Sequence, residues 1–82
     1  MKFKRISKLL QEFYDHEINA NVLTVYPKGK KLYKRVNVIY KNDRFLMSLL
    51  DAEGKILKTT SFEADRDSIP LDRITDWVTK QL

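Results

Sequence analysis

The sequence predicts an α+β protein of the order α-β-β-β-β-α, in which two helices flank a four-stranded antiparallel meander sheet. Apolar residues recur at helical spacing near both ends of the chain, and runs rich in β-branched and aromatic residues lie between them. A two-residue Asn-Asp loop also joins two of these runs so that apolar residues face each other across the hairpin. The chain has 82 residues, which predicts a single domain over residues 1–82.

The N-terminal segment carries an apolar stripe with the i, i+3, i+7 spacing of an amphipathic helix. Charged and amide side chains fill the opposite side of this predicted helix. The pattern fades in DHEINAN, residues 15–21, where the two asparagines favour a loop. The predicted stripe consists of Phe3, Ile6, Leu9, Leu10, Phe13 and Tyr14.

Four strands are predicted at residues 22–26, 31–40, 44–50 and 55–63. Pro27 and Gly29 predict a turn after the first strand, because proline presets φ and glycine accepts a positive φ. DAEG, residues 51–54, predicts the turn before the fourth strand. The length of that turn leaves open whether Ile56 or Leu57 points into the core.

The loop at Asn42 and Asp43 fixes the register of the second and third strands, because both residue types tolerate the left-handed conformation. Three apolar pairs then share one face, which we expect to be the core face. These pairs are Tyr40 with Phe45, Val38 with Met47, and Val36 with Leu49. The opposite face pairs Ile39 with Leu46, Asn37 with Ser48, and Arg35 with Leu50.

The C-terminal segment predicts a second helix over residues 70–81. Pro70 suits the first turn of a helix, and Asp72 complements the helix dipole there. Leu71, Ile74 and Val78 form its apolar stripe, with Trp77 at the edge as a core residue rather than a ligand-stacking one.

Composition narrows the functional classes. The chain has no cysteine, no continuous apolar run of a signal peptide and no apolar stretch long enough to span a membrane, so we expect a cytoplasmic protein. Its net charge is +5, split between residues 1–50, with eleven basic and four acidic residues, and residues 51–82, with five basic and seven acidic. This asymmetry could steer a polyanion or align two copies head to tail.

Catalytic and metal-binding chemistry find little support in the sequence. His16 is the one histidine, and without cysteine it has too few partners for a metal site. No serine lies in a strained nucleophile turn, and the carboxylates of EADRD, residues 63–67, fit a solvated link better than an acid–base pair. We therefore expect no enzyme activity, no cofactor and no small-molecule substrate.

The segment YPKGKKLYKRVNVIY, residues 26–40, carries five basic residues, three tyrosines and no acid. An exposed sheet face with tyrosines and nearby cations can stack bases and neutralise phosphates. The alternative is that the lysines only protect the sheet edge against aggregation. Under the first hypothesis, Tyr26 lies on the same sheet face as Tyr33. The predicted contacts to DNA or RNA are Lys28, Lys30, Lys31, Tyr33, Arg35 and Arg44.

A second apolar row lies on the same predicted outer face as the tyrosines and consists of Ile39, Leu46 and Leu50. A small monomer rarely leaves such a row exposed, so either the second helix or a second copy of the chain is expected to cover it. The sequence thus predicts a small non-enzymatic binding module that acts on nucleic acid with weak selectivity. The alternative is a homodimeric adaptor that binds another protein.

Residues 44–62, RFLMSLLDAEGKILKTTSF, precede the second helix and resemble part of the small arm-binding domains of phage-type integrases. The matched positions are Phe45, Asp51, Gly54 and Phe62. In that family the sheet enters the major groove of DNA, so the resemblance implies a DNA contact. It covers this segment alone, the N-terminal helix has no counterpart, and the C-terminal part departs from the family in being acidic. We assign no family from it.

Overall fold

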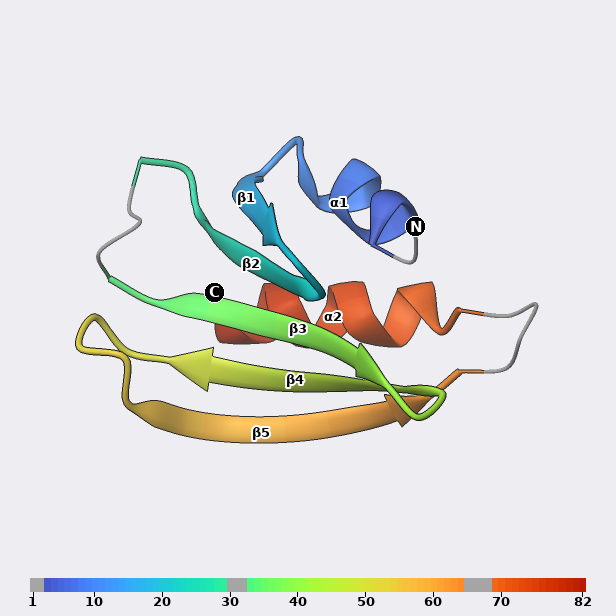
Figure 1. The fold of residues 1–82 in the computed structure, drawn as a ribbon. Coiled ribbons are helices and arrows are strands. Elements are labelled where there is room, and N and C mark those ends of the chain that lie inside the picture. The colour runs from blue at the N-terminus through green and yellow to red at the C-terminus, as the bar shows by residue number, and fades with distance from the viewer. Residues whose placement is uncertain (1–2, 30–32, 65–68) are drawn as a thin grey trace.

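The computed structural model describes residues 3–29, 33–64 and 69–82 and has the predicted α+β architecture. Five strands form one antiparallel sheet in the order β1-β2-β3-β4-β5, so the predicted four-stranded meander gains a strand at its N-terminal edge (Figure 1). The elements are α1 (Lys4–Leu10), β1 (Tyr14–Asn19), β2 (Val22–Pro27), β3 (Arg35–Lys41), β4 (Arg44–Leu50), β5 (Ile56–Glu63) and α2 (Leu71–Gln81).

The additional strand β1 corrects the predicted loop over residues 15–21 and shortens the first helix, which ends at Leu10. β1 is an edge strand whose side chains are exposed or half-buried, so it shows no run of buried residues. Tyr14 and Ile18 pack against the core, and they alternate with acidic residues at a period of two. That alternation was the available strand signal, but the helical spacing of Tyr14 with Leu10 competed with it.

A two-residue turn, Ala20-Asn21, joins β1 to β2 in the register Asn19 opposite Val22. Ala20 has a φ of 53°, a left-handed conformation that costs an ordinary residue about 1–2 kcal/mol. We therefore expect Ala20→Gly to raise the free energy of unfolding by about 1 kcal/mol, because glycine adopts this φ without steric cost. Urea unfolding would measure it, and a loss of stability would contradict the turn geometry. Ala52→Gly, at a turn position where no positive φ is recorded, is the matched control.

The hairpin of β3 and β4 has the predicted loop and register. Asn42 and Asp43 have φ values of 53° and 58°, and the Cα partners confirm all six predicted pairs, including Tyr40 with Phe45. The rings of Tyr40 and Phe45 lie 4.9 Å apart between centroids. The Tyr40 hydroxyl donates to the Asp43 carboxylate at 3.1 Å. The pKa of Tyr40 is raised, mainly because the ring is partly buried. The hydrogen bond to Asp43 and the negative charge of Asp43 raise it further.

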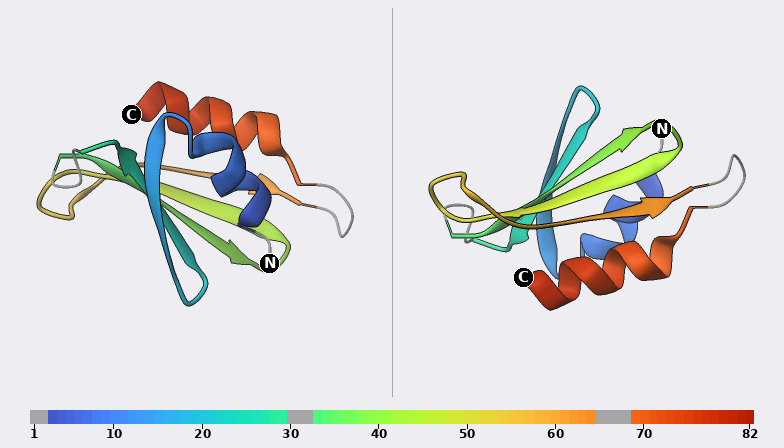
Figure 2. Two further views of the ribbon diagram at one scale, coloured as in Figure 1. Left: turned by 90° about the horizontal axis from the view of Figure 1, so that it is seen from above. Right: turned by 90° about the horizontal axis from the view of Figure 1, so that it is seen from below.

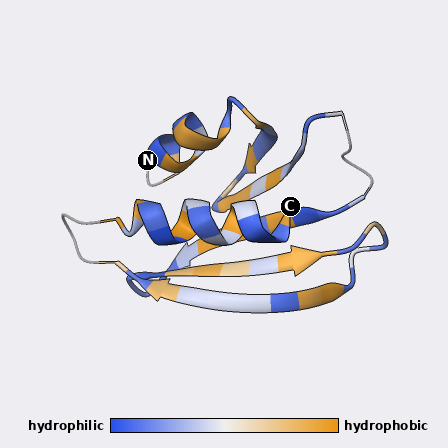
Figure 3. Ribbon diagram, turned by 180° about the vertical axis from the view of Figure 1, so that it is seen from behind, coloured by the Kyte–Doolittle hydropathy of each residue, from blue (hydrophilic) through white to orange (hydrophobic). Residues whose placement is uncertain are grey.

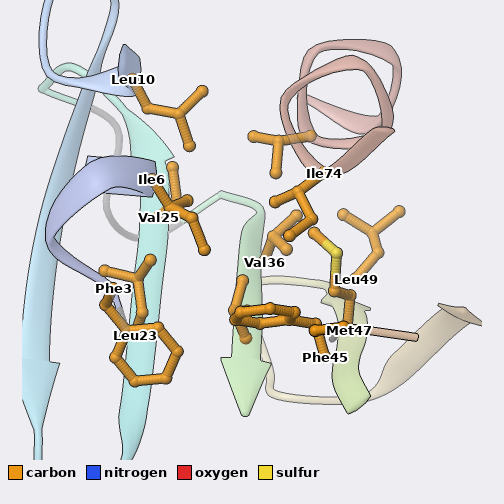
Figure 4. Close-up of a cluster of buried hydrophobic side chains, with 13 residues drawn as sticks. Phe3, Ile6, Leu10, Leu23, Val25, Val36, Phe45, Met47, Leu49 and Ile74 are labelled. Carbon is orange, nitrogen blue, oxygen red and sulfur yellow. The ribbon is translucent and has the colours of Figure 1, made fainter. Parts of the chain in front are cut away.

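Both helices pack on the same face of the sheet, as the views from above and behind show (Figures 2 and 3). Phe3, which precedes α1, and Ile6 and Leu10 of α1 meet Leu23 and Val25 of β2 in one hydrophobic core (Figure 4). Ile74 and Val78 of α2 complete that core over the inward residues of β3 and β4, namely Val36, Val38, Phe45, Met47 and Leu49. We call the opposite side of the sheet the outer face; neither described helix covers it.

The start of β5 settles the open question about Ile56 and Leu57. A register irregularity at Leu49 and Leu50 pairs Leu50 with Ile56 and leaves Leu57 without a paired position. Both Ile56 and Leu57 are exposed, so neither enters the core. Phe62, at the other end of β5, packs against the core instead.

Candidate nucleic-acid interface

The residues predicted to contact nucleic acid fall at two opposite ends of the sheet. Arg35 begins β3 and pairs with Leu50 at the end of β4, whereas Arg44 begins β4 and pairs with Lys41. Strands rise by about 3.3 Å per residue, so the six steps from Arg35 to Lys41, which pairs with Arg44, separate the two arginines by about 20 Å. The sheet therefore does not gather the predicted set into one compact site.

One end of the sheet carries the connection between β2 and β3, which we call the basic loop, residues 28–34. Tyr33 in this loop is 69% exposed, and Lys28 and Lys34 are also exposed. The backbone N–H of Gly29, with a φ of 72°, donates to the Asp15 carboxylate at 3.4 Å and ties the loop to β1. The predicted contacts Lys30 and Lys31 lie outside the described residues.

Arg35 is held by the turn between β4 and β5. Its Nη1 donates to the carbonyl oxygen of Asp51 at 3.4 Å, and a Cβ added at Gly54 would lie 3.3 Å from its Nη2. The Asp51 carboxylate accepts the backbone N–H groups of Glu53 and Lys55, both at 2.9 Å, and closes that turn. Arg35 thus connects the end of the basic loop to the turn between β4 and β5. One of its N–H donors is already used in this contact.

Arg44 lies at the opposite end of the sheet and pairs with Glu63. Its Nη2 is 2.8 Å from Glu63 Oε1, and both side chains are exposed. Glu63 is also its partner across β4 and β5, so the contact follows from the sheet register. The carboxylate offsets the guanidinium charge that a phosphate would need, so Arg44 is a poor candidate for the site.

Tyr26 does not serve as a second stacking platform, because it is buried and its hydroxyl donates to Glu17 Oε1 at 3.3 Å. Lys34 was missed because a strand starting at residue 31 would place it on the core face. β3 instead begins at Arg35, which leaves Lys34 exposed beside Tyr33. The basic loop and the start of β3 thus provide the described cations Lys28, Lys34 and Arg35 and the ring of Tyr33.

The predicted self-association row is only partly exposed. Leu46 is 38% exposed and Ile39 is half-buried, but Leu50 is 8% exposed. Of the two expected covers for this row, the second helix is wrong, since α2 packs on the opposite face of the sheet. The exposed apolar residues of the outer face are thus Leu46, together with Ile56 and Leu57 near the start of β5.

Within the described ranges, no three histidine, aspartate or glutamate side chains come close enough together to hold a metal ion. The two described helices are too short to cross a membrane.

Comparison with known proteins adds no assignment: no protein-family model, no curated protein and no solved structure matches this chain. The functional argument therefore depends on the geometry of the chain itself.

Proposed function

We propose that the protein is a non-enzymatic binding module that holds single-stranded nucleic acid through its basic loop. The observation that supports this most directly is the exposure of Tyr33, which is 69% exposed in the basic loop and is followed by the exposed Lys34. Residues 26–41 contain no acid, so the charge along the loop itself is of one sign. Cations that follow the backbone and an aromatic ring that stacks on a base are the two elements of single-strand binding.

The neighbouring turn limits how strongly this end can attract phosphate. Asp51 and Glu53 lie in the turn that Arg35 contacts, and Asp15 contacts Gly29. These carboxylates reduce the positive field, which fits weak and salt-sensitive binding better than tight binding. Ring stacking and phosphate contacts do not read base edges, so low sequence selectivity is expected.

Tyr33→Ala tests the stacking contact. We expect it to weaken binding to a single-stranded oligonucleotide by about 1–3 kcal/mol, and binding to a duplex much less, because only an unpaired base offers its face to the ring. Fluorescence anisotropy at two salt concentrations would measure both affinities. Tyr33→Phe keeps the ring and is expected to bind like the wild type.

Arg44→Gln is the matched control at the far end of the sheet, where we expect little change in affinity. If Tyr33→Ala binds as well as the wild type while Arg44→Gln does not, the contact surface lies at the other end. If the wild-type protein binds neither strand form at low salt, the basic loop is a solvated connection and the proposal is wrong.

The outer face favours a second candidate function, binding of another protein. Leu46, Ile56 and Leu57 are exposed there, and no described helix lies over them. Such a contact would respond little to salt, unlike a phosphate contact. Leu46→Ser would weaken it without changing affinity for nucleic acid, and this difference separates the two functions.

A further inference from the structure

A groove of about 560 Å³ runs between α1 and α2 on the side of the molecule away from the outer face. Leu9 and Phe13 form its rim on the α1 side, and Asp72, Thr75 and Thr79 form its rim on the α2 side. This groove includes two side chains that the helical pattern predicts to be buried. The exposure of these two side chains is the clearest difference between the structure and the pattern predicted from the sequence.

Phe13 is 68% exposed and Leu9 is 54% exposed. α1 ends at Leu10, so Phe13 leaves the helical stripe and stands at the mouth of the groove rather than in the core. Burying an exposed phenylalanine side chain is one of the larger gains open to a small protein, because the gain scales with the apolar area removed from water. An occupant that covers Phe13 and Leu9 would thus bind with an apolar contact at its centre.

The threonine hydroxyls that line the groove do not need an occupant as a hydrogen-bond acceptor. The Thr75 hydroxyl donates to the carbonyl oxygen of Leu71 at 2.8 Å, and the Thr79 hydroxyl donates to that of Thr75 at 2.8 Å. Both hydroxyl protons are therefore used within α2. Among the described residues that line the groove, Asp72 is the one with a charge, so an apolar occupant that also carries a cation would fit best.

The α1 rim of this same chain has that chemistry. Lys4, Arg5 and Lys8 of α1 are exposed, and its first turn contains no acid. On α2, Arg73 and Lys80 do not line the groove; they line a separate hollow together with Phe62, Asp76 and Trp77. Arg73 also lies beside Asp72 in a third hollow at the start of α2. The groove thus has an apolar rim on the α1 side and one carboxylate, Asp72, on the α2 side. The exposed cations of α1 lie outside the lining, and Glu12, beside Phe13, is the one acid among residues 3–13.

We infer that this groove is a self-association surface whose occupant is the α1 rim of a second copy of the chain. A two-fold axis along the groove sets the α1 rim of each copy on the α2 rim of the other. Phe13 and Leu9 of one protomer then cover the partner's groove, and the cations of α1 approach Asp72 on the α2 rim of the other copy. Residues 1–50 are net positive and residues 51–82 net negative, so this arrangement brings the positive half of each copy toward the negative half of the other.

The outer face is a weaker surface for a second copy. Leu46 pairs there with Ser61, and Ser48 pairs with Thr59, so hydroxyl side chains separate Leu46 from Ile56 and Leu57. The groove instead brings Leu9 of α1 and Phe13, which follows α1, together in one concave surface. Packing of one copy on another favours such a surface over scattered apolar residues.

Sedimentation of the full chain at micromolar concentration tests the inference. The wild type is expected to form a species of twice the 9.8 kDa chain mass, and Phe13→Glu is expected to be a monomer. Leu46→Glu, which places the same charge on the outer face, is expected to remain a dimer. A monomeric wild type, or dissociation by Leu46→Glu but not by Phe13→Glu, would overturn the inference. Because Phe13 is exposed in the monomer, Phe13→Glu should keep the wild-type far-ultraviolet circular dichroism, and Leu9→Ser provides a second, milder variant.

A charge exchange tests the pairing of the two rims. Arg5→Glu with Lys8→Glu is expected to raise the dimer dissociation constant about fivefold, and Asp72→Lys is expected to raise it by a similar factor. Combining the two sets of changes restores opposite charges across the interface and should recover most of the affinity. If the combined variant dimerises more weakly than either parent, the α1 rim does not meet the α2 rim and the inference is wrong.

Discussion

Phe45→Ala is expected to lower the free energy of unfolding by about 3–5 kcal/mol, the range for truncating a buried aromatic side chain. Phe45 is fully buried at the start of β4, with the Tyr40 ring 4.9 Å away across the hairpin. Phe62 is its partner on β5 and also packs against the core. Loss of the ring leaves a cavity that these neighbours cannot fill without moving the strands. Urea unfolding followed by circular dichroism would measure the loss.

The size of this effect matters because the domain is small. Stabilities of about 0.05–0.15 kcal/mol per residue are typical, so a loss of 3–5 kcal/mol is a large share of the total. Leu46→Ala, one residue along β4 on the outer face, is the matched control and is expected to change stability by about 0.5 kcal/mol. Equal losses for the two variants would indicate a strand register shifted by one residue.

The β3–β4 hairpin could be predicted from the sequence because two independent constraints agree there. The Asn42-Asp43 loop sets the register, and the apolar alternation of both strands is satisfied in that register alone. A slip by one residue would move Val36 and Val38 to the outer face, at the cost of their burial. Local turn chemistry and core burial thus specify the same pairing.

The end of α1 could not be predicted in the same way. Phe13 continues the helical spacing of Phe3, Ile6 and Leu10, yet it is exposed after the helix ends. No proline or glycine follows Leu10 to stop the helix. The pairing of β1 with β2 decides the boundary, and this long-range contact competes with a short helix whose intrinsic stability is marginal.

The candidate interface was only partly predictable, because side-chain pairing depends on registers that the sequence left open. Tyr33 and Lys28 lie at the surface as the sequence predicts, while their contact with nucleic acid stays a prediction. The Arg44–Glu63 ion pair depends on the β4–β5 register, which contains an irregularity near Leu50. The contact of Arg35 with the carbonyl oxygen of Asp51 likewise depends on how the turn folds over β3. Composition identifies the cations, but only the pairing shows which of them are available.

Reversing the two described lysines of the basic loop, with Lys28→Glu and Lys34→Glu together, is expected to weaken nucleic-acid binding about 25-fold near 0.1 M salt. Each phosphate contact to a single strand contributes about 0.7 to the slope of log affinity against log salt. Losing two contacts removes about 1.4 from the slope, which corresponds to an affinity loss of about 25-fold at 0.1 M salt. Both side chains are exposed, so the fold should be retained. Anisotropy titrations of a single-stranded oligonucleotide across a salt series would give the affinity and the slope.

The slope separates a phosphate contact from a general effect of charge. If Lys28 and Lys34 contact phosphate, the double variant loses about 1.4 from the magnitude of the slope as well as affinity. Lys4→Glu with Lys8→Glu, which reverses two exposed cations of α1, changes net charge equally and is the matched control. Because α1 lies outside the basic loop, this control is expected to lose much less affinity. An equal loss in both variants would show that binding follows the overall charge of the protein, and the basic loop would then have no special role.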